Sequence, residues 1–392
     1  MSTRIIMAVT NDLVTDQRVD RSCLALGEAG YDVTLIGRCL PDSLPVSRPY
    51  RTSCMRLLFR RSALFYAEYN LRLMLRLLFM RADAFYANDT DTLMACYLAA
   101  RLRRKPLFFD AHEMFPEVPE LVGRPAVKRV WQRIEDFILP RIAKRSDMAA
   151  VTVCQSIADI YRERYNIQMA VVRNVPMHYE TASADVSSLL ANVAEGQKIL
   201  LYQGAVNVGR GIEVVMQAMP LLPECHLLVA GVGDKYQELR QRAEEMHCGN
   251  ISFLGRLEPA MLHSLTLHAD LGLSLLENRG LNYYYSFPNR IADFVQAGVP
   301  VLATDFPEIH RIVDGFGIGT LVEPAPFDSE RCTSQWPLPE EMAAIILDAL
   351  HYWESMPDDE KKHHFATAAL NLSWQNDKKI LINAFNTIMN NV

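Results

Sequence analysis

Short apolar runs alternate with longer stretches whose apolar residues recur at a helical period along the first half of the chain. The apolar runs are RIIMAV, YDVTLIG, AFYAND, PLFFDAHE and MAAVTV, and they occupy residues 4–9, 31–37, 84–89, 106–113 and 148–153. The helical patterns between them occupy residues 18–29, 91–104 and 124–145. Strands that alternate with helices of this length predict a parallel sheet wound by right-handed crossovers.

The same alternation resumes after a polar segment, residues 177–197, which predicts a linker. We predict an α/β protein with two doubly wound, Rossmann-like domains over residues 1–180 and 181–365. A final helix, residues 366–392, is expected to pack back towards the first domain. Because open parallel sheets bind ligands at the carboxyl ends of their strands, two such sheets that face each other predict an interdomain cleft. The apolar runs of the second half occupy residues 198–204, 226–233, 251–255, 271–276, 299–305 and 319–324, and residues 340–392 favour helix throughout.

Charge is distributed more unevenly than the formal net charge of −6 suggests. Residues 1–180 hold 26 Lys and Arg residues against 20 Asp and Glu residues, whereas residues 181–392 hold 14 against 26. A basic first half predicts an anionic partner, either a membrane surface or a phosphate-bearing acceptor. We expect no nucleic acid among the partners.

Many basic residues of the first half lie in residues 51–81. On a helix, Leu71, Met74, Leu75 and Leu78 fall on one face, and the arginines gather towards another. This pattern predicts an interfacial helix that lies on anionic lipid. A core-facing helix with a solvated basic face is the alternative. The segment holds one acid against seven arginines, which are Arg51, Arg56, Arg60, Arg61, Arg72, Arg76 and Arg81.

The sequence shows neither the pattern of a membrane-spanning segment nor that of a signal peptide for export. No run reaches 18 consecutive apolar residues, and the opening residues lack the apolar stretch and cleavage site of a signal peptide. We therefore expect a cytoplasmic protein that lies at most peripherally on the inner face of the cell membrane. No two of the eight cysteines lie within four residues of each other, so we expect neither a metal nor a redox pair and interpret them as small core hydrophobes.

Residues 281–308, LNYYYSFPNRIADFVQAGVPVLATDFPE, carry the most chemistry. Asn289 and Arg290 follow a proline at the start of a predicted helix, where backbone N–H groups and the helix dipole favour phosphate. Asp293 lies about one turn further on, where its carboxylate could accept hydrogen bonds from a ribose diol. A solvated acid at a helix start is the alternative for Asp293.

This region resembles the retaining glycosyltransferases of family 4, which have the two-domain GT-B fold. Their signature has two glutamates with seven residues between them, followed by a helix and Gly-x-Pro. Matching on Gly298 and Pro300 places the second glutamate at Asp293 and the first at Tyr285, so the second acid is kept one methylene shorter and the first is absent. Phe287 falls on the aromatic residue of the family's loop. The resemblance implies that Asp293 holds the donor ribose.

The resemblance extends to two glycine-rich segments. In YQGAVNVGRGIE, Arg210 stands where the family has the late cation of its phosphate loop, and Ala205 stands at the early one. In VAGVGDKY, Tyr236 fills the third glycine position of a dinucleotide fingerprint, which argues against a dehydrogenase. The donor-binding residues that we expect are Gly204, Arg210, Gly231, Gly233, Phe287, Asn289, Arg290, Asp293 and Glu308.

The sharpest feature of the first half is FFDAHEMFPE, residues 108–117. A zinc-protease motif is excluded because proline stands at position 116 instead of the second histidine. Family members often carry His or His-Glu here, close to the sugar, so the resemblance implies that His112 and Glu113 line the acceptor side, together with Asp16 and Arg18. ANDTD, residues 87–91, occupies another loop of this kind, but we favour an ordinary helix cap over a functional role for it. The expected catalytic residues are His112, Arg210 and Asp293.

These features predict transfer of a sugar from a nucleotide sugar to a lipid-linked acceptor or a precursor of cell-envelope polysaccharide. A diphosphate is a stable leaving anion, so a positive clamp formed by Arg210 and Arg290 needs neither a metal nor a cofactor. Retention of configuration is implied by the family resemblance alone. A nucleotide-sugar epimerase of the GT-B fold and a degenerate, non-catalytic GT-B protein are the alternatives, the latter because Tyr285 replaces a glutamate.

Overall fold

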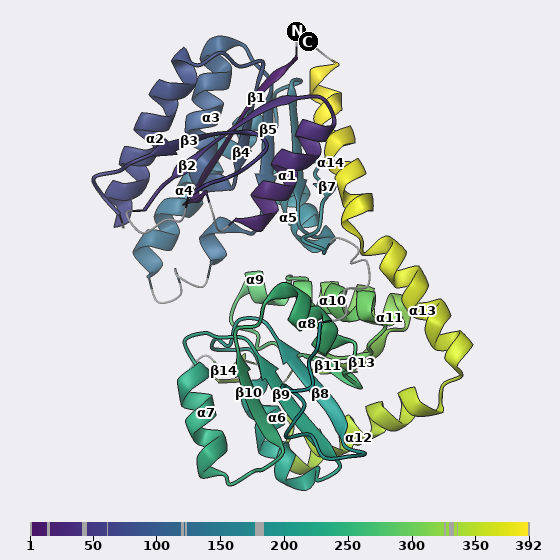
Figure 1. Ribbon diagram of the computed structural model, residues 1–392. Coiled ribbons are helices and arrows are strands. Elements are labelled where there is room, and N and C mark those ends of the chain that lie inside the picture. Colours follow the sequence, from purple (N-terminus) through teal and green to yellow (C-terminus); the bar gives the residue numbers. More distant parts are fainter. Residues whose placement is uncertain are drawn as a thin grey trace. The chain divides into compact units, whose positions relative to one another are not determined.

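The computed structural model describes residues 2–13, 16–40, 45–60, 62–118, 121, 124–176, 184–324, 327–328, 333–334 and 336–390. The chain forms two compact units, Met1–Asn174 with Asp377–Val392, and Val175–Asn376. Each unit contains one parallel sheet with helices around it (Figure 1). Of the predicted linker, residues 184–197 belong to the second unit, and residues 177–183 lie outside the described residues.

The sheet of the first unit has seven parallel strands in the order β3-β2-β1-β4-β5-β6-β7. All five predicted strands are present, and the strands β3 and β7 are additions to the prediction. Every residue of β4 and β5 is buried, as expected for a parallel sheet covered on both faces. The strands are β1 (Arg4–Asp12), β2 (Asp32–Arg38), β3 (Arg51–Met55), β4 (Ala84–Asn88), β5 (Leu107–Ala111), β6 (Met148–Thr152) and β7 (Ala170–Val171).

Six α-helices and one 3-10 helix are described around this sheet. The last of them, α14, brings Phe385 onto the sheet, where its ring centroid lies 5.4 Å from that of Phe108 and 6.5 Å from that of Tyr86. The residues of α14 from Asp377 onward therefore complete the core of the first unit (Figure 1). The helices are α1 (Gln17–Glu28), α2 (Ser62–Phe79), α3 (Thr90–Arg103), η1 (Phe115–Glu117), α4 (Pro125–Ile142), α5 (Gln155–Tyr165) and α14 (Trp374–Met389).

The second unit has a six-stranded parallel sheet in the order β10-β9-β8-β11-β12-β13, and all six predicted strands are present. The strands are β8 (Lys198–Gln203), β9 (Cys225–Ala230), β10 (Ile251–Gly255), β11 (Leu271–Ser274), β12 (Val301–Thr304) and β13 (Gly319–Val322), and β14 (Phe327–Asp328) pairs separately with β15 (Thr333–Ser334). The helices are α6 (Ile212–Ala218), η3 (Met219–Leu221), α7 (Tyr236–Glu245), α8 (Pro259–Thr266), α9 (Leu281–Tyr284), α10 (Asn289–Ala297), α11 (Pro307–Phe316), α12 (Pro339–Ser355) and α13 (Asp358–Asn371).

The carboxyl-terminal region is three helices and not one continuous helical stretch. Helix α12 ends before Met356, and Pro357 is the N-cap of α13. A second break lies between α13 and α14. Proline explains the first break, because its ring fixes φ and it lacks the N–H group that would continue the helix.

The cysteine prediction is wrong for one pair. Cys39 and Cys54 form a disulfide, with their Cα atoms 5.7 Å apart. The parallel pairing of β2 with β3 sets Cys54 opposite Gly37 and thereby brings the two thiols together. Four other cysteines are buried as expected, namely Cys23, Cys96, Cys154 and Cys225, while Cys248 is half-buried. Cys332 lies outside the described residues.

Candidate functional site

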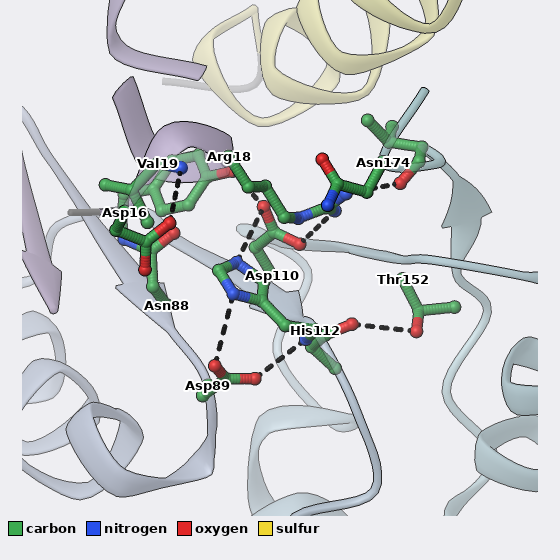
Figure 2. A network of polar contacts seen from close by, with 12 residues as sticks. Asp16, Arg18, Val19, Asn88, Asp89, Asp110, His112, Thr152 and Asn174 are labelled. Atoms are coloured by element: carbon green, nitrogen blue, oxygen red, sulfur yellow. Dashed lines mark hydrogen bonds and ion pairs between the residues drawn. The ribbon is translucent and has the colours of Figure 1, made fainter. Parts of the chain in front are cut away.

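His112 follows directly after β5, at the carboxyl edge of the first sheet. The order of the sheet reverses nearby, between β1 and β4, which is the place where open α/β sheets bind ligands. The imidazole of His112 lies between two carboxylates: Nδ1 is 3.2 Å from Oδ2 of Asp89, and Nε2 is 3.5 Å from Oδ2 of Asp110 (Figure 2). The side chain is 15% exposed. The predicted histidine is thus placed at the expected edge.

Asp110 is the buried anchor of this network. Its side chain is fully buried, and its Oδ1 lies 2.7 Å from Nη2 of Arg18. Tyr86 donates its hydroxyl to Oδ2 at 2.7 Å. Burial favours the neutral acid, but Arg18 and His112 outweigh it and hold the pKa of Asp110 below its usual range. Asp110 therefore remains an anion beneath His112.

The same groups keep His112 charged. Burial favours the neutral imidazole, but Asp89 and Asp110 outweigh it and raise the pKa of His112 to about 9. A carboxylate near each ring nitrogen favours the form in which both nitrogens carry a proton. At neutral pH His112 is therefore a cation.

The other acceptor-side residues of the prediction lie around this network with partners of their own. Asp16 is the N-cap of α1 and accepts a hydrogen bond from the backbone N–H of Val19 at 3.1 Å. Arg18 is buried and donates to the carbonyl of Val172 at 2.7 Å as well as binding Asp110. Glu113 is half-buried. Arg18 thus supports the network from inside the protein, and the acceptor-side role of these residues stays a prediction.

The interpretation of ANDTD as an ordinary helix cap is wrong for Asp89. Asp89 is the N-cap residue of α3, but its side chain makes no capping hydrogen bond. Its carboxylate accepts the backbone N–H of His112 at 2.7 Å instead (Figure 2). Tertiary packing brings the backbone N–H and the ring of His112 to this carboxylate, in place of the N–H groups of its own helix.

In the second unit, two glycines let the loops after β8 and β9 touch backbone to backbone. Gly231 has φ +149°, and a Cβ atom there would lie 1.8 Å from the carbonyl oxygen of Gly204. Gly233 is similarly crowded, because a Cβ atom would lie 2.3 Å from the carbonyl oxygen of Val206. Glycine is therefore required at these positions, where the two loops meet at the carboxyl edge of the sheet.

Arg290 lies beside these loops at the start of α10. It is 8% exposed, and its guanidinium lies over the ring of Tyr202, 4.3 Å from the centroid. Its Nη1 atom is buried and has no hydrogen-bond partner among the described residues. Burial, with a contribution from the nearby Arg210, lowers the pKa of Arg290. A buried guanidinium with an unused donor, next to a second cation, is an arrangement that an anion would stabilise.

Arg210 shares this character. Its guanidinium lies 5.2 Å from the ring centroid of Tyr283, and its Nε atom is buried without a hydrogen-bond partner in the part of the chain that the structure describes. Neither Arg210 nor Arg290 forms an ion pair with a carboxylate among those residues. Sequence reasoning missed the supporting tyrosines, Tyr202 and Tyr283. Their position beside the glycine loop and before the Pro-Asn-Arg turn was the available signal.

Asp293 lies at the same edge of the second sheet. Its Oδ2 accepts a hydrogen bond from Nε2 of Gln203 at 3.3 Å, and Gln203 is the last residue of β8. The Oε1 atom of Gln203 in turn accepts the hydroxyl of Thr266 at 2.8 Å. Sequence reasoning missed Gln203, whose signal is a polar residue at the end of an otherwise apolar strand. The structure thus brings Gly204, Arg290 and Asp293 together around the end of β8.

The remaining predicted donor residues lie near but make other contacts. Glu308, in the first turn of α11, is buried and pairs with Arg311 at 2.8 Å. Asn289, the first residue of α10, is exposed, and Phe287 packs against the core of the second unit. Tyr285 is half-buried, with its ring centroid 4.9 Å from that of Tyr284. Their roles toward a donor stay predictions.

The described residues contain no group of three or more His, Cys, Asp or Glu side chains arranged to hold a metal ion. They also contain no helix that is both long enough and apolar enough to cross a membrane.

Helix α2 has two apolar faces. Its core face consists of Phe65, Tyr69, Leu73 and Leu77. Its opposite face exposes Leu64, Leu71, Leu75 and Phe79, of which Phe79 is 85% exposed. The predicted face of residues 71–78 is thus the outward one, although Met74 and Leu78 are half-buried and residues 51–55 form β3 and not helix.

Basic side chains flank the exposed face of α2, and a second exposed apolar face lies on the adjacent helix. Arg72 pairs with Glu68 at 2.8 Å, and Arg76 donates to the hydroxyl of Ser53 at 2.9 Å. Tyr66 of α2 and Trp131 of α4 are in edge-on contact, with ring centroids 4.9 Å apart, so the two helices are neighbours. Helix α4 also exposes large apolar side chains, which are Val127, Val130 and Phe137.

Two family models match the chain. The model for Glycosyltransferase Family 4 matches residues 17–176, and the model for Glycosyl transferases group 1 matches residues 197–334. The two matches together span most of both units. None of the curated protein sequences matches this chain significantly.

Solved structures resemble the whole chain. Sucrose-phosphate synthase from Thermosynechococcus elongatus is 16% identical, with all of both chains covered and a TM-score of 0.73. The protein HepE from Anabaena, in complex with UDP-glucose, is 14% identical over 98% of this chain and 99% of that chain, with a TM-score of 0.69. WaaG, a glycosyltransferase involved in lipopolysaccharide biosynthesis, is 14% identical over 98% and 99%, with a TM-score of 0.60. These likenesses confirm the predicted GT-B fold with two Rossmann-like, parallel-sheet domains.

Proposed function

We propose that this chain, which belongs to the family-4 glycosyltransferases, binds a nucleoside-diphosphate sugar on its second unit and transfers the sugar to an acceptor held by its first unit. The observation that carries this proposal is the pair of arginines, Arg210 and Arg290, that have unused buried donors and no carboxylate partner among the described residues. Both stand at the carboxyl edge of the second sheet, where such sheets bind ligands.

The arrangement of these side chains suits a diphosphate. A guanidinium can donate to two oxygens at once, and Arg290 adds its charge to the N-terminus of α10, where the helix dipole already favours an anion. The glycines of the loops after β8 and β9 carry no side chain that would keep the phosphates away from the backbone, so these loops would accept the diphosphate. Asp293, held by Gln203, would accept hydrogen bonds from the ribose hydroxyls. HepE, whose structure contains UDP-glucose, has the same fold and makes that nucleotide sugar a suitable first probe.

The chemistry follows from the leaving group. As the bond between the sugar and the diphosphate breaks, negative charge develops on the phosphate oxygens, and Arg210 and Arg290 would stabilise it without reorganising. The acceptor's hydroxyl proton would pass to the departing phosphate, with retention of configuration and without a metal. His112, in the first unit, would act on the sugar and the acceptor and not on the nucleotide.

We propose further that the exposed faces of α2 and α4 dock on an anionic membrane, which would supply a lipid-linked acceptor. The exposed apolar side chains of α2, Leu64, Leu71, Leu75 and Phe79, lie opposite its core face, and Leu58 in the preceding loop is 79% exposed. Exposed arginines lie on both helices, Arg72 and Arg76 on α2 and Arg133 and Arg141 on α4, so each helix combines exposed apolar area with positive charge. That combination matches the interface of an anionic bilayer, where each basic residue contributes about 1 kcal/mol.

One experiment separates transfer from the two alternatives, an epimerase and a non-catalytic binder. Release of free nucleotide is measured from UDP-glucose and from a panel of other nucleotide sugars, with and without lipid-linked acceptors. A transferase requires the acceptor for rapid release and yields a glycosylated product. An epimerase converts the nucleotide sugar without any acceptor. Binding without turnover across the whole panel would contradict the proposal and favour a non-catalytic protein.

A further inference from the structure

Asp89 has a backbone conformation that aspartate rarely adopts. Its φ is +60° and its ψ is 167°, a region populated almost only by glycine. A strained residue of this kind persists only where its surroundings hold it in place, and such residues gather at functional sites. Asp89 lies between β4 and α3, next to the point where the strand order of the first sheet reverses.

The polar groups of Asp89 are directed at the end of β5. Its backbone N–H donates to the carbonyl of Asp110 at 2.8 Å. Its Oδ1 accepts the backbone N–H of His112 at 2.7 Å, and its Oδ2 lies 3.2 Å from Nδ1 of the same histidine (Figure 2). One side chain therefore fixes both the backbone and the ring of His112. No capping bond to α3 competes for it.

Both ring nitrogens of His112 face carboxylates inside the protein. Nδ1 faces Asp89, and Nε2 is buried and faces Asp110 without a hydrogen bond to any described residue. A nitrogen in that position is poorly placed to take a proton from an acceptor. The exposed part of the side chain is small, so His112 presents its charge, and not a free nitrogen, to the carboxyl edge of the sheet.

We propose that Asp89 is a positioning residue that fixes His112 as an imidazolium with both ring nitrogens turned inward, so that His112 acts on the reaction through its charge and not by moving a proton. The part that concerns the reaction rests on the function proposed above, whereas the part that concerns the charge of His112 does not.

The charged groups around His112 support this assignment. Asp89 and Asp110 favour the imidazolium, Arg18 on α1 opposes it, and Asp91 on α3 contributes little negative charge at neutral pH because burial raises its pKa to about 8. The attraction of the two carboxylates outweighs burial and raises the pKa of His112 to about 9. Removing the charge of Asp89 should therefore bring the histidine back towards its ordinary range near 6.5.

The first test is an NMR titration of His112 in the intact protein, with its signal assigned by its absence in His112→Gln. In Asp89→Asn we expect the pKa of His112 to fall by at least about one unit. Asp83 is the matched control: it precedes β4 as Asp89 follows it, and its carboxylate likewise accepts a backbone N–H, that of Arg4, at 3.0 Å. Asp83→Asn should leave the titration of His112 unchanged. An unchanged pKa in Asp89→Asn would overturn the proposal, whatever the protein's activity.

Asp89→Gly tests whether the loop conformation alone is what matters. Glycine adopts φ +60° without strain, so this variant keeps the backbone path of the loop while it removes the carboxylate. If Asp89 positions His112, the variant lowers the pKa of His112 and reduces turnover at least tenfold. Wild-type titration and turnover in Asp89→Gly would show that the side chain has only a local structural role and would overturn the proposal.

The pH profile of sugar transfer gives the second readout. A fixed cation predicts that turnover falls as the pH rises through the pKa of His112, and that this fall moves to lower pH in Asp89→Asn. If His112 instead accepts a proton in the reaction, turnover should rise as the pH rises through the same pKa. A rising limb that shifts with Asp89→Asn would therefore overturn the part of the proposal that concerns charge.

Discussion

Arg173 and Asp377 lie 204 residues apart in the sequence and form an ion pair in which Nη2 and Oδ1 are 2.9 Å apart. Asp377 is fully buried and also accepts the backbone N–H of Arg173 at 2.6 Å. The chain leaves the first unit after Asn174 and re-enters it at Asp377. The pair therefore joins the exit and the return of the chain within one unit.

We predict that Asp377→Ala lowers the free energy of unfolding by about 3–5 kcal/mol, because it leaves the guanidinium and the backbone N–H of Arg173 without their partner. The matched control is Lys378→Ala, one residue further on, which removes an ion pair with Glu28 at the surface. Exposed pairs contribute about 0–1 kcal/mol. Urea unfolding followed by circular dichroism measures both. Losses of similar size in the two variants would contradict this account of the pair.

Asp91 makes the stability of the first unit depend on pH. Burial raises its pKa to about 8, above its value of about 4 in an unfolded chain. Between these values the unfolded chain loses a proton that the folded protein keeps, so this contribution to stability falls as the pH rises from 4 to 8.

Asp91→Asn should remove this dependence, because asparagine is neutral and can still accept the hydrogen bond that Thr10 donates. Between pH 5 and pH 8 we expect the free energy of unfolding of the variant to rise by at least about 1.4 kcal/mol relative to that of the wild type, the equivalent of one pKa unit. Urea unfolding of both proteins at pH 5 and at pH 8 measures this difference in the free energy of unfolding. If the free energy of unfolding changes equally between the two pH values in both proteins, Asp91 is ionised in the folded state and the prediction is wrong.

His112→Ala should lower turnover by about 10²-fold or more while changing nucleotide affinity by less than about threefold. The reason is that His112 belongs to the first unit, whereas the proposed nucleotide clamp belongs to the second. Steady-state kinetics and calorimetric titration with the same nucleotide sugar measure the two quantities, and His310→Ala, which changes an exposed histidine on α11, is the control. A loss of nucleotide affinity without a loss of turnover per bound donor would place His112 in the donor site or the scaffold.

Flotation with liposomes tests the proposed docking of α2 and α4. Binding should rise with the content of anionic lipid, fall with salt, and drop when Arg56, Arg60 and Arg61 are changed to glutamate, since each basic residue contributes about 1 kcal/mol. Arg61 itself lies outside the described residues. Changing Leu71 and Leu75 to serine should weaken binding through the apolar contribution alone.

The control for that experiment changes arginine to glutamate in the second unit. Arg240→Glu with Arg242→Glu alters exposed arginines of α7 in the second unit and should leave flotation unchanged. Equal recovery with neutral and anionic liposomes, or no recovery with either, would show that the outward face of α2 has another role.

Most of the strands that the sequence predicted are largely buried, because a continuous apolar run between turns is a strong local signal, although β10 and β13 are mostly half-buried. The prediction from the sequence missed β3, whose residues RTSCM are mostly exposed at the edge of the sheet, and β7, which has two residues. The disulfide between Cys39 and Cys54 was missed for a related reason. It depends on the pairing of β2 with β3, and neither the edge strand nor its register has a signal in the sequence.

In the candidate site, too, residues with a local sequence pattern were predicted, whereas a contact made by strand pairing was missed. Arg210, Arg290 and Asp293 were predicted from a glycine-rich loop, from a helix start and from the family resemblance, and their role toward a donor stays a prediction. Asp89 was assigned to a helix cap, which is the local preference of Asn-Asp-Thr. Its actual partner, the backbone N–H of His112, directly follows β5 and is brought near by the pairing of β4 with β5.

Calorimetric titration of the protein with nucleoside-diphosphate sugars, beginning with UDP-glucose, tests the central claim most directly. We predict that at least one of them binds the wild type, and that Arg210→Ala and Asp293→Ala each weaken it by about 1.5–3 kcal/mol without unfolding the protein, because each removes a charged hydrogen-bond partner. Arg242→Ala, which changes an exposed arginine of α7, should bind like the wild type. Unchanged affinity in both site variants, or no binding of any nucleotide sugar to the wild type, would contradict the donor site described here.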